Sequence, residues 1–504
     1  MPWCGHRFAM TTTSKALRRA PALAAAVLAL HGASSVATAQ APATVLVERA
    51  ATAMGGAAAL RSLNNVTFEF NAANFGLGQE ETPASPARAT FQFGRIINDY
   101  RGGRRLTTTE SRAVTGAVQR QRGVVTPTVG SSEINGVQTA TGAAAVANVA
   151  ADMRAQPERL IVAALDNPAQ LTMVAPKRIR GEMMDGVRMG SGADARTIWF
   201  DRLTHLPIAV ERVTDDPILG DRRTTTLYTR WEDAGGVKLS REVDVDVNGR
   251  LQSHQVVTSA SVNSTLAESD FAIPDSIMSR AQPQPPTPPV ITVTLAEIGP
   301  NVWRAEGGSH HSLVIRQGDG LVVVEAPQST ARSKAVLDTL RARFAGVPVK
   351  TLVPTHHHWD HSGGIREYLA QGVPVVVHSR NVEFVRGIGA APKTVVPDAL
   401  SRGGRMPTVS AAGNATSIGT GDTRVMLLDL PTVHAEGVLA AYVPSLRILF
   451  VSDVLTPGPT LAPAGSREIA AMVRARGIVV DRVVGGHGGI AAWADVERAG
   501  RIRD

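Results

Sequence analysis

The stretch PTHHHWDHSGG, residues 354–364, holds four histidines and one aspartate within six consecutive positions. Imidazole and carboxylate groups bind metal ions, and a run this polar does not serve the packing of an apolar core. If the chain is extended here, side chains alternate between two faces, so His356 and His358 share one face and His357 points to the other. Two imidazoles on one face at this spacing can chelate one metal ion.

The rest of the cluster can serve a second ion. Asp360 and His361 follow where the chain turns toward the next helix, and the glycine pair at 363–364 permits a tight strand-to-helix turn. Zinc accepts nitrogen and oxygen ligands of this kind and tolerates an open position in catalytic sites. The cluster therefore predicts half of a metal site, and the remaining ligands must come from distant loops.

Three later positions have the residue types and the setting that the other half requires. LLDLPTVH ends in His434, RILFVSD ends in Asp453, and IVVDRVVGGH ends in His487. Each follows an apolar run typical of a buried strand, so these strand ends are expected to meet the cluster at one edge of the sheets. The alternative is that these residues only cap strand ends or lie in an ordinary loop.

With this order and spacing, residues 290–504 resemble the metallo-β-lactamase superfamily. The resemblance implies an α/β fold, an αββα sandwich with two zinc ions at one edge of two packed sheets. It implies the following ligands: His356, His358 and His434 for the first zinc, Asp360, His361 and His487 for the second, and Asp453 as the bridge. Iron or manganese in place of zinc stays open.

Other histidines and one glutamate accompany these positions. His357 is interpreted as a structural or supporting residue, and His378 as structural. His310 and His311 are candidates for the mouth of the pocket. Glu325, after the apolar run LVVV, is a candidate to orient a ligand histidine from behind.

The chain around the cluster alternates between strand and helix patterns. Strand-like runs occupy 313–327, 349–355 and 373–379, and helical patterns occupy 329–344 and 364–372. Strands that alternate with helices predict an α/β layered domain.

Residues 45–275 read mainly as antiparallel strands with period-two alternation and turn residues between them. The segment 157–169 predicts a helix, and the Ala/Gly-rich segment 141–152 is ambiguous. No ligand cluster or nucleophile motif occurs in this half. Its last hundred residues resemble the curved-sheet domains of periplasmic lipoprotein carriers, which implies a concave sheet able to hold an amphipathic molecule. A scaffold without a ligand is the alternative.

The segment AQPQPPTPPV, residues 281–290, contains five prolines and predicts an extended spacer without hydrogen-bonded structure. We therefore expect four parts: a signal peptide at 1–39, a β-rich domain at 40–280, a linker at 281–289 and the metallo-β-lactamase-like domain at 290–504.

The first 39 residues have the pattern of an export signal, with a basic start, a short apolar run, and small residues at Ala37 and Ala39. Cleavage is expected after Ala39, and a buried N-terminal helix is the alternative. Removing this segment takes away the only cysteine, Cys4, and leaves 48 basic and 44 acidic residues, a formal charge of +4. We expect a periplasmic or secreted protein with no disulfide, no transmembrane segment and no nucleic-acid partner.

The chemistry of the predicted site favours hydrolysis. Two Zn²⁺ ions, two aspartates and one hydroxide leave a charge of about +1, which lowers the pKa of bound water toward about 7 and holds an anionic intermediate. Asp360 would orient the hydroxide and shuttle its proton. We expect a metal-bound hydroxide to act on an ester, lactone, lactam or other amide bond of a small molecule.

Three branches of the superfamily fit this sequence poorly. Asp453 occupies the position of the cysteine ligand found in one type of β-lactamase, and the seventeen residues after His487 are too few for the helical domain of glyoxalase II. The 53-residue interval from His434 to His487 leaves no room for nuclease insertions. The alternatives that remain are a mononuclear iron oxygenase of the same fold and a periplasmic carrier whose metal domain is secondary. The oligomeric state is open.

Overall fold

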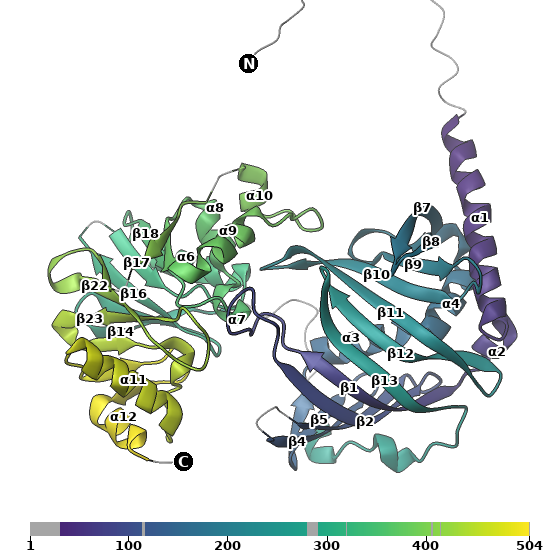
Figure 1. Ribbon diagram of the computed structural model, residues 1–504, viewed down its shortest axis with the longest axis horizontal. Coiled ribbons are helices and arrows are strands. Elements are labelled where there is room, and N and C mark those ends of the chain that lie inside the picture. Colours follow the sequence, from purple (N-terminus) through teal and green to yellow (C-terminus); the bar gives the residue numbers. More distant parts are fainter. Residues whose placement is uncertain are drawn as a thin grey trace, which may run out of the picture.

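The computed structural model describes residues 31–112, 116–279, 291–318, 320–404, 407–413 and 415–502. The predicted linker at 281–289 and the first 30 residues of the predicted signal peptide lie outside these ranges. Figure 1 shows one body built on a large curved sheet from the first half of the chain and a second body of packed sheets and helices from the second half.

The first half forms a thirteen-stranded antiparallel sheet, which confirms the strand pattern predicted for it. Strands that are neighbours in the sequence mostly pair with each other, the pair of β1 with β13 joins the two runs of strands, and β6 and β7 form the edges. The strands are β1 Asn65–Phe75, β2 Ala89–Asp99, β3 Arg104–Arg112, β4 Val118–Val125, β5 Gly130–Ile134, β6 Val137–Thr141, β7 Leu171–Ile179, β8 Glu182–Met189, β9 Arg196–Asp201, β10 Pro207–Asp216, β11 Gly220–Ala234, β12 Val237–Val247 and β13 Arg250–Val262.

Helices pack against one face of this sheet. The helices on this face are α1 His31–Ala53, α2 Ala57–Arg61, α3 Ala143–Ala155 and α4 Pro157–Asp166, and the short helix α5 Asp275–Met278 lies after β13 and contacts β6. The helix predicted at 157–169 is α4, and the ambiguous segment at 141–152 is largely α3. The buried positions Ala43 and Val47 of α1 come after the predicted cleavage point, so cleavage there would keep the packed part of the helix. None of the helices in the described ranges is long and apolar enough to cross a membrane.

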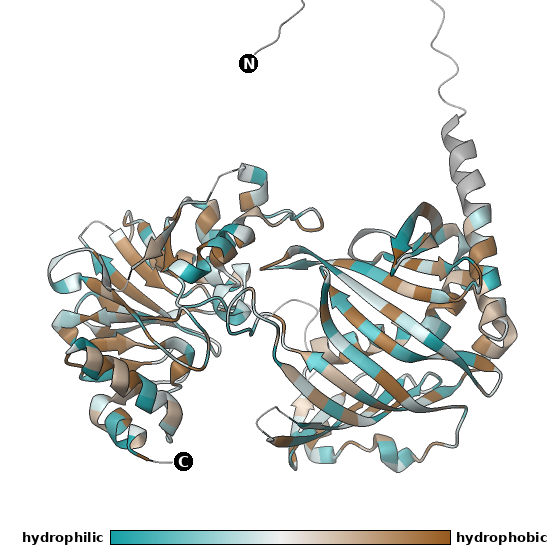
Figure 2. Ribbon diagram, in the orientation of Figure 1, coloured by the Kyte–Doolittle hydropathy of each residue, from teal (hydrophilic) through white to brown (hydrophobic). Residues whose placement is uncertain are grey.

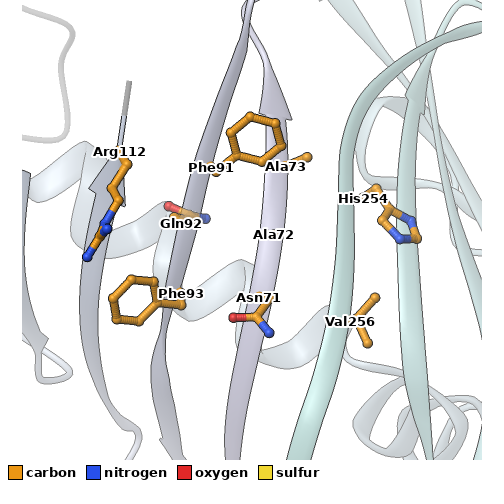
Figure 3. Close-up of a pocket in the computed structure, with 9 residues that line it drawn as sticks. All are labelled: Asn71, Ala72, Ala73, Phe91, Gln92, Phe93, Arg112, His254 and Val256. Atoms are coloured by element: carbon orange, nitrogen blue, oxygen red, sulfur yellow. The ribbon is translucent and has the colours of Figure 1, made fainter. Parts of the chain in front are cut away.

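The sheet bears a hollow on each face. Between the sheet and helices α3 and α4 lies a cavity of about 540 Å³ with a mixed lining that includes Arg196, Arg212, Tyr228 and Val243. The opposite face carries a shallower hollow of about 350 Å³ across β1, β2, β3 and β13, shown in Figure 3. None of the residues that line either hollow belongs to the histidine and aspartate groups of the second half.

The second half contains two sheets and the helices around them. The seven-stranded sheet comprises β14 Thr294–Gly299, β15 Val302–Glu306, β16 Ser312–Gln317, β17 Gly320–Val324, β18 Val349–Val353, β19 Val375–His378 and β20 Val409–Ala412. The six-stranded sheet comprises β21 Ala415–Ile418, β22 Val425–Asp429, β23 Leu439–Val443, β24 Ile448–Phe450, β25 Arg482–Val484 and β26 Ile490–Ala492. The helices are α6 Thr330–Arg343, α7 Trp359–Ser362, α8 Ile365–Ala370, α9 Val382–Ala390, α10 Ala399–Gly403, α11 Pro463–Arg476 and α12 Trp493–Gly500.

Three apolar cores show that these layers form an αββα sandwich, as predicted. One core lies between the two sheets and joins Val322 of β17 to Leu427 and Phe450 of the other sheet. A second core packs the seven-stranded sheet against α6 and α8, and a third packs the six-stranded sheet against α11 and α12. Figure 2 shows the strands between the helices as mainly hydrophobic, which fits sheets covered on both faces.

Helix α6 offers a direct test of a local sequence signal. Ser329 is its N-cap, and the serine side chain accepts a hydrogen bond from the main-chain N–H of Arg332 at 3.2 Å. Replacing Ser329 by Ala is expected to lower the free energy of unfolding by about 1 kcal/mol, because that N–H loses its acceptor. Chemical denaturation measures the change. Ser329→Asn is the matched control, since asparagine caps equally well and should keep the stability within a few tenths of a kcal/mol.

Candidate metal centre

The seven residues that the sequence indicates as metal ligands come together at one edge of the two sheets. His356, His358, Asp360 and His361 follow β18, and His434, Asp453 and His487 follow β22, β24 and β25 respectively. With His310 they make two groups of four, and within each group the ligand-type atoms lie within 4.8 Å of one another. The three later loops therefore supply the other half of the cluster, as expected.

The strand alternation expected for His356, His357 and His358 is wrong. Strand β18 ends at Val353, so residues 354–358 are not in the strand and strict alternation does not set their directions. His357 and His358 do not point to opposite sides: both Nε2 atoms donate to the main-chain carbonyl of Glu80, at 3.0 and 2.9 Å. The loop after the strand, held by tertiary contacts, decides how these rings lie.

The first group consists of His356, His358, His434 and Asp453. Nε2 of His434 lies 3.2 Å from Nε2 of His356 and 3.3 Å from Oδ2 of Asp453. The ring of His358 lies 4.5 Å from that of His434, centroid to centroid. These are the three histidines predicted for the first ion, together with the predicted bridging aspartate.

The second group consists of His310, Asp360, His361 and His487. Nε2 of His487 and Nε2 of His361 are 3.3 Å apart, and each lies 2.8 Å from Oδ1 of Asp453. The two carboxylate oxygens of Asp453 thus face different groups, so this residue would be the one to contact both ions. His310, expected only at the pocket mouth, places Nε2 3.3 Å from Oδ2 of Asp360 and belongs to the group.

Hydrogen bonds fix which nitrogen of each buried ring carries the proton. The rings of His358 and His487 donate to main-chain carbonyls, which only accept, through Nε2 to Glu80 and through Nδ1 to Ser309. Nδ1 of His361 donates to Glu325. Nδ1 of His356 faces Oγ1 of Thr355, whose own hydrogen goes to Glu325. Each of these four rings therefore has one nitrogen held by a protein partner and the other directed into the site, the arrangement that metal-ligating histidines have.

This donor set fits divalent metal ions. Two imidazoles bound to one tetrahedral zinc, with Zn–N bonds of about 2.0–2.1 Å, hold their nitrogens about 3.3 Å apart. The Nε2 pairs of His356 with His434 and of His361 with His487 are 3.2 and 3.3 Å apart. Nδ1 of His358 is buried with no hydrogen-bond partner in the described part of the chain. A shared proton can join one such pair of nitrogens, whereas a metal ion can bind all the nitrogens of a group together.

The pKa shifts of the side chains in the two groups also fit a bound cation. Burial lowers the pKa of His356 well below its ordinary value and that of His358 to about 4, so both rings are neutral near pH 7. Burial works against ionisation of Asp453, but the three histidine rings beside its oxygens hold the pKa of this carboxyl far below its usual range. Burial also opposes protonation of His361, yet the charge of Glu325 and the contact with Asp453 raise its pKa. Carboxylates that attract a proton attract a metal cation as well, and the two compete.

Glu325 links three segments of the site through buried contacts, as expected for a residue that orients a ligand histidine. It is fully buried at the end of β17 and accepts hydrogen bonds from Thr355 and from Ser452 Oγ at 2.9 Å. Its other oxygen lies 3.0 Å from Nδ1 of His361. Its φ of 79° is unusual for a residue with a side chain, which is typical of strain kept at a functional site.

The remaining histidines lie outside both groups. His357 has the supporting contact to Glu80, and His378 accepts a hydrogen bond from the main chain of Arg380 at 3.2 Å. The main-chain N–H of His311 donates to Gly486 and so ties the start of β16 to the loop of His487. No sequence pattern predicted the contacts made by Ser452 or by the loop between β1 and β2, residues 76–88, which contains Glu80.

Comparison with known proteins places this geometry in a family. Residues 305–487 match the model of the Metallo-beta-lactamase superfamily, and the match begins just before His310 and ends at His487. The C-terminal sandwich belongs to this superfamily. A metallo-β-lactamase fold thus carries all eight residues of the two groups.

Among curated proteins, the chain is similar to the 2,4-dinitroanisole O-demethylase subunit alpha of Nocardioides sp. (strain JS1661), at 23% identity over 170 residues. The aligned part covers 34% of this chain and 48% of that subunit, so the chain spans about half of this relative. Solved structures of the fold include a metallo-beta-lactamase from Pontibacter korlensis (18% identity, 41% of this chain and 95% of that one, TM-score 0.33). The FIM-1 enzyme of Pseudomonas aeruginosa, in its mono-zinc form, is similar as well (15% identity, 42% and 95%, TM-score 0.34).

Proposed function

We propose that this protein is an exported metallo-hydrolase that binds two zinc ions and acts on an ester, lactone, lactam or other amide bond of a small molecule. The observation that carries the proposal is the set of fixed imidazoles: four rings are each held at one nitrogen and direct the other at two groups that meet at Asp453. His356, His358 and His434 would hold the first ion, and Asp360, His361 and His487 the second. His310 would support the second ion beside Asp360.

A divalent ion in this site would lower the pKa of a bound water toward about 7 and polarise the bond under attack. The protein residues have separate tasks. Asp360 is more than a third exposed, so it lies at the open side of the site where a substrate arrives. Its carboxyl is held ionised, because hydrogen bonds from His310 and Gln79 and the charge of His361 outweigh the effect of burial on its pKa. It can therefore accept a hydrogen bond from a nucleophilic water and orient it.

The signal-peptide pattern of residues 1–39 supports export from the cytoplasm. We propose a signal peptide that ends at Ala39, a β-rich domain at 40–280, a linker at 281–289 and the catalytic domain at 290–504. The chain beyond residue 39 has no cysteine, so nothing in its chemistry depends on the redox state of its compartment. Detection of the mature protein in periplasmic or culture fractions, with an N-terminus at Gln40, tests this point.

Metal removal is expected to abolish turnover. Protein purified without added metal is analysed for zinc, iron and manganese, treated with a chelator, and assayed against panels of esters, lactones, lactams and phosphodiesters. An aryl methyl ether belongs in the screen because the curated relative is named an O-demethylase. We expect about two metal ions per chain, loss of hydrolysis on chelation and recovery with Zn²⁺. Turnover that survives complete chelation would contradict the proposal.

The same experiment distinguishes the hydrolase from two alternative functions. A mononuclear iron oxygenase would contain one iron and need O₂, whereas the full second group favours two ions. A carrier is favoured by the cavity of about 540 Å³ in the N-terminal sheet, which has the size of a small-molecule site. A carrier would bind its ligand equally well after chelation.

A further inference from the structure

The loop between β1 and β2, residues 76–88, leaves the N-terminal sheet and reaches the metal centre of the other body. Figure 1 shows this loop beside α7. Nε2 of Gln79 donates to Oδ1 of Asp360 at 2.8 Å, across 281 positions of sequence. The main-chain carbonyl of Gly78 accepts from the N–H of Trp359 at 3.2 Å. The loop thus contacts a predicted ligand of the second ion.

The same loop fixes a ligand of the first ion. The carbonyl of Glu80 accepts from Nε2 of His358 at 2.9 Å, which leaves Nδ1 of that ring as the atom aimed into the first group. Because a carbonyl cannot donate, this contact excludes the other neutral tautomer. At the end of the loop, the guanidinium of Arg88 donates to the main-chain carbonyls of Val433 at 3.1 Å and His434 at 3.3 Å. One loop therefore contacts three predicted ligands that come from two different segments.

The loop is built to hold this position. The side chain of Glu80 is 2% exposed, accepts from the N–H of Gly78 at 2.8 Å and pairs with Arg250 of β13. The carbonyl of Glu81 accepts from the N–H of Glu436 at 2.8 Å. Gly78 has a φ of 84°, and a Cβ there would lie 2.2 Å from Cδ2 of Trp359, so glycine alone allows this approach.

We propose that loop 76–88 is a working part of the metal centre, in which Gln79 positions Asp360 and the main chain of Glu80 positions His358. The inference rests on the proposed function and deepens it. Gln79 is exposed beside the open side of the site, so its side chain also borders the path of the substrate. The N-terminal sheet is then the support of an active-site loop, and the metal domain alone lacks the contacts that this loop makes to Asp360, His358 and His434.

The test measures metal binding directly in the full chain, with Zn²⁺ and Co²⁺ as probes and a competing chelator. In Gln79→Ala we expect the weaker of the two ions to bind about 10–100-fold less tightly, the usual effect of removing a partner that orients a ligand. The unfolding midpoint should stay the same, because Gln79 is exposed. Gln119→Ala, an exposed glutamine on β4, is the matched control and should leave both affinities unchanged.

A second variant moves the loop as a whole. Gly78→Ala forces the main chain away from Trp359 and is expected to weaken both ions and to alter the visible spectrum of the Co²⁺-loaded protein. With an active substrate, Gln79→Ala should lower kcat more than it changes KM. Two tightly bound ions in the wild type and unchanged affinities in Gln79→Ala would overturn the loop proposal and leave the proposed function standing. A wild type that binds neither probe would overturn both.

Discussion

His358→Ala is expected to remove one metal ion per chain and to reduce hydrolysis by about 10³-fold or more. The ring is 1% exposed, and its partner at Nε2 leaves Nδ1 as the atom directed at the first group. Alanine takes away one of three histidines predicted for that ion, and the ion contributes several kcal/mol to the stabilisation of charge in the transition state. Each 1.36 kcal/mol is a factor of ten in rate, which gives the expected loss.

Metal analysis and steady-state kinetics on the best substrate of the screen measure this effect. His205→Asn is the control: this histidine lies in the turn between β9 and β10 with a φ of 59°, which asparagine tolerates. The control should keep its metal and its activity. If His358→Ala retains binding of a ligand while its metal content falls, the carrier function is favoured, and full turnover with the metal lost would contradict the hydrolase proposal.

Glu325→Ala is expected to lower the free energy of unfolding by about 3–5 kcal/mol and to weaken the site around His361. The carboxylate is 0% exposed and receives the Thr355 and Ser452 hydroxyls as well as the imidazole of His361. Removal of one partner from a buried charged network leaves the others without hydrogen bonds in a dry environment, which is costly. His361 also loses the group that favours the tautomer able to bind metal.

Denaturant unfolding with a chelator present separates this effect from metal binding, since a bound ion stabilises the folded state by mass action. Glu325→Gln is the matched variant, because it keeps the volume and two polar atoms but not the charge. It should lose less stability than Glu325→Ala and still bind the second ion more weakly than the wild type. A loss below about 1 kcal/mol in Glu325→Ala would mean that the network is not a structural support of the site.

Much of the site could be predicted from sequence because its signals are local. The clustered ligands at 356–361 and the single ligands at His434, Asp453 and His487 each follow an apolar run, and strand ends meet at sheet edges. The alternation of strand and helix patterns predicted an α/β layered domain, and the resemblance to the superfamily implied the αββα order of its layers. Strand alternation failed at residues 354–358, since β18 ends earlier and loop contacts orient His357 and His358.

The order and chemistry of the ligands were thus determined by the sequence itself, because residue type and apolar periodicity are properties of short segments. Only the tertiary structure decided that His310 joins Asp360, that Ser452 and Thr355 share one buried carboxylate, and that Gln79 reaches across from another sheet. Such contacts join segments far apart in the chain and depend on how whole sheets and loops pack. A polar residue in a loop looks the same in sequence whether it faces water or a metal ligand, and packing alone makes the difference.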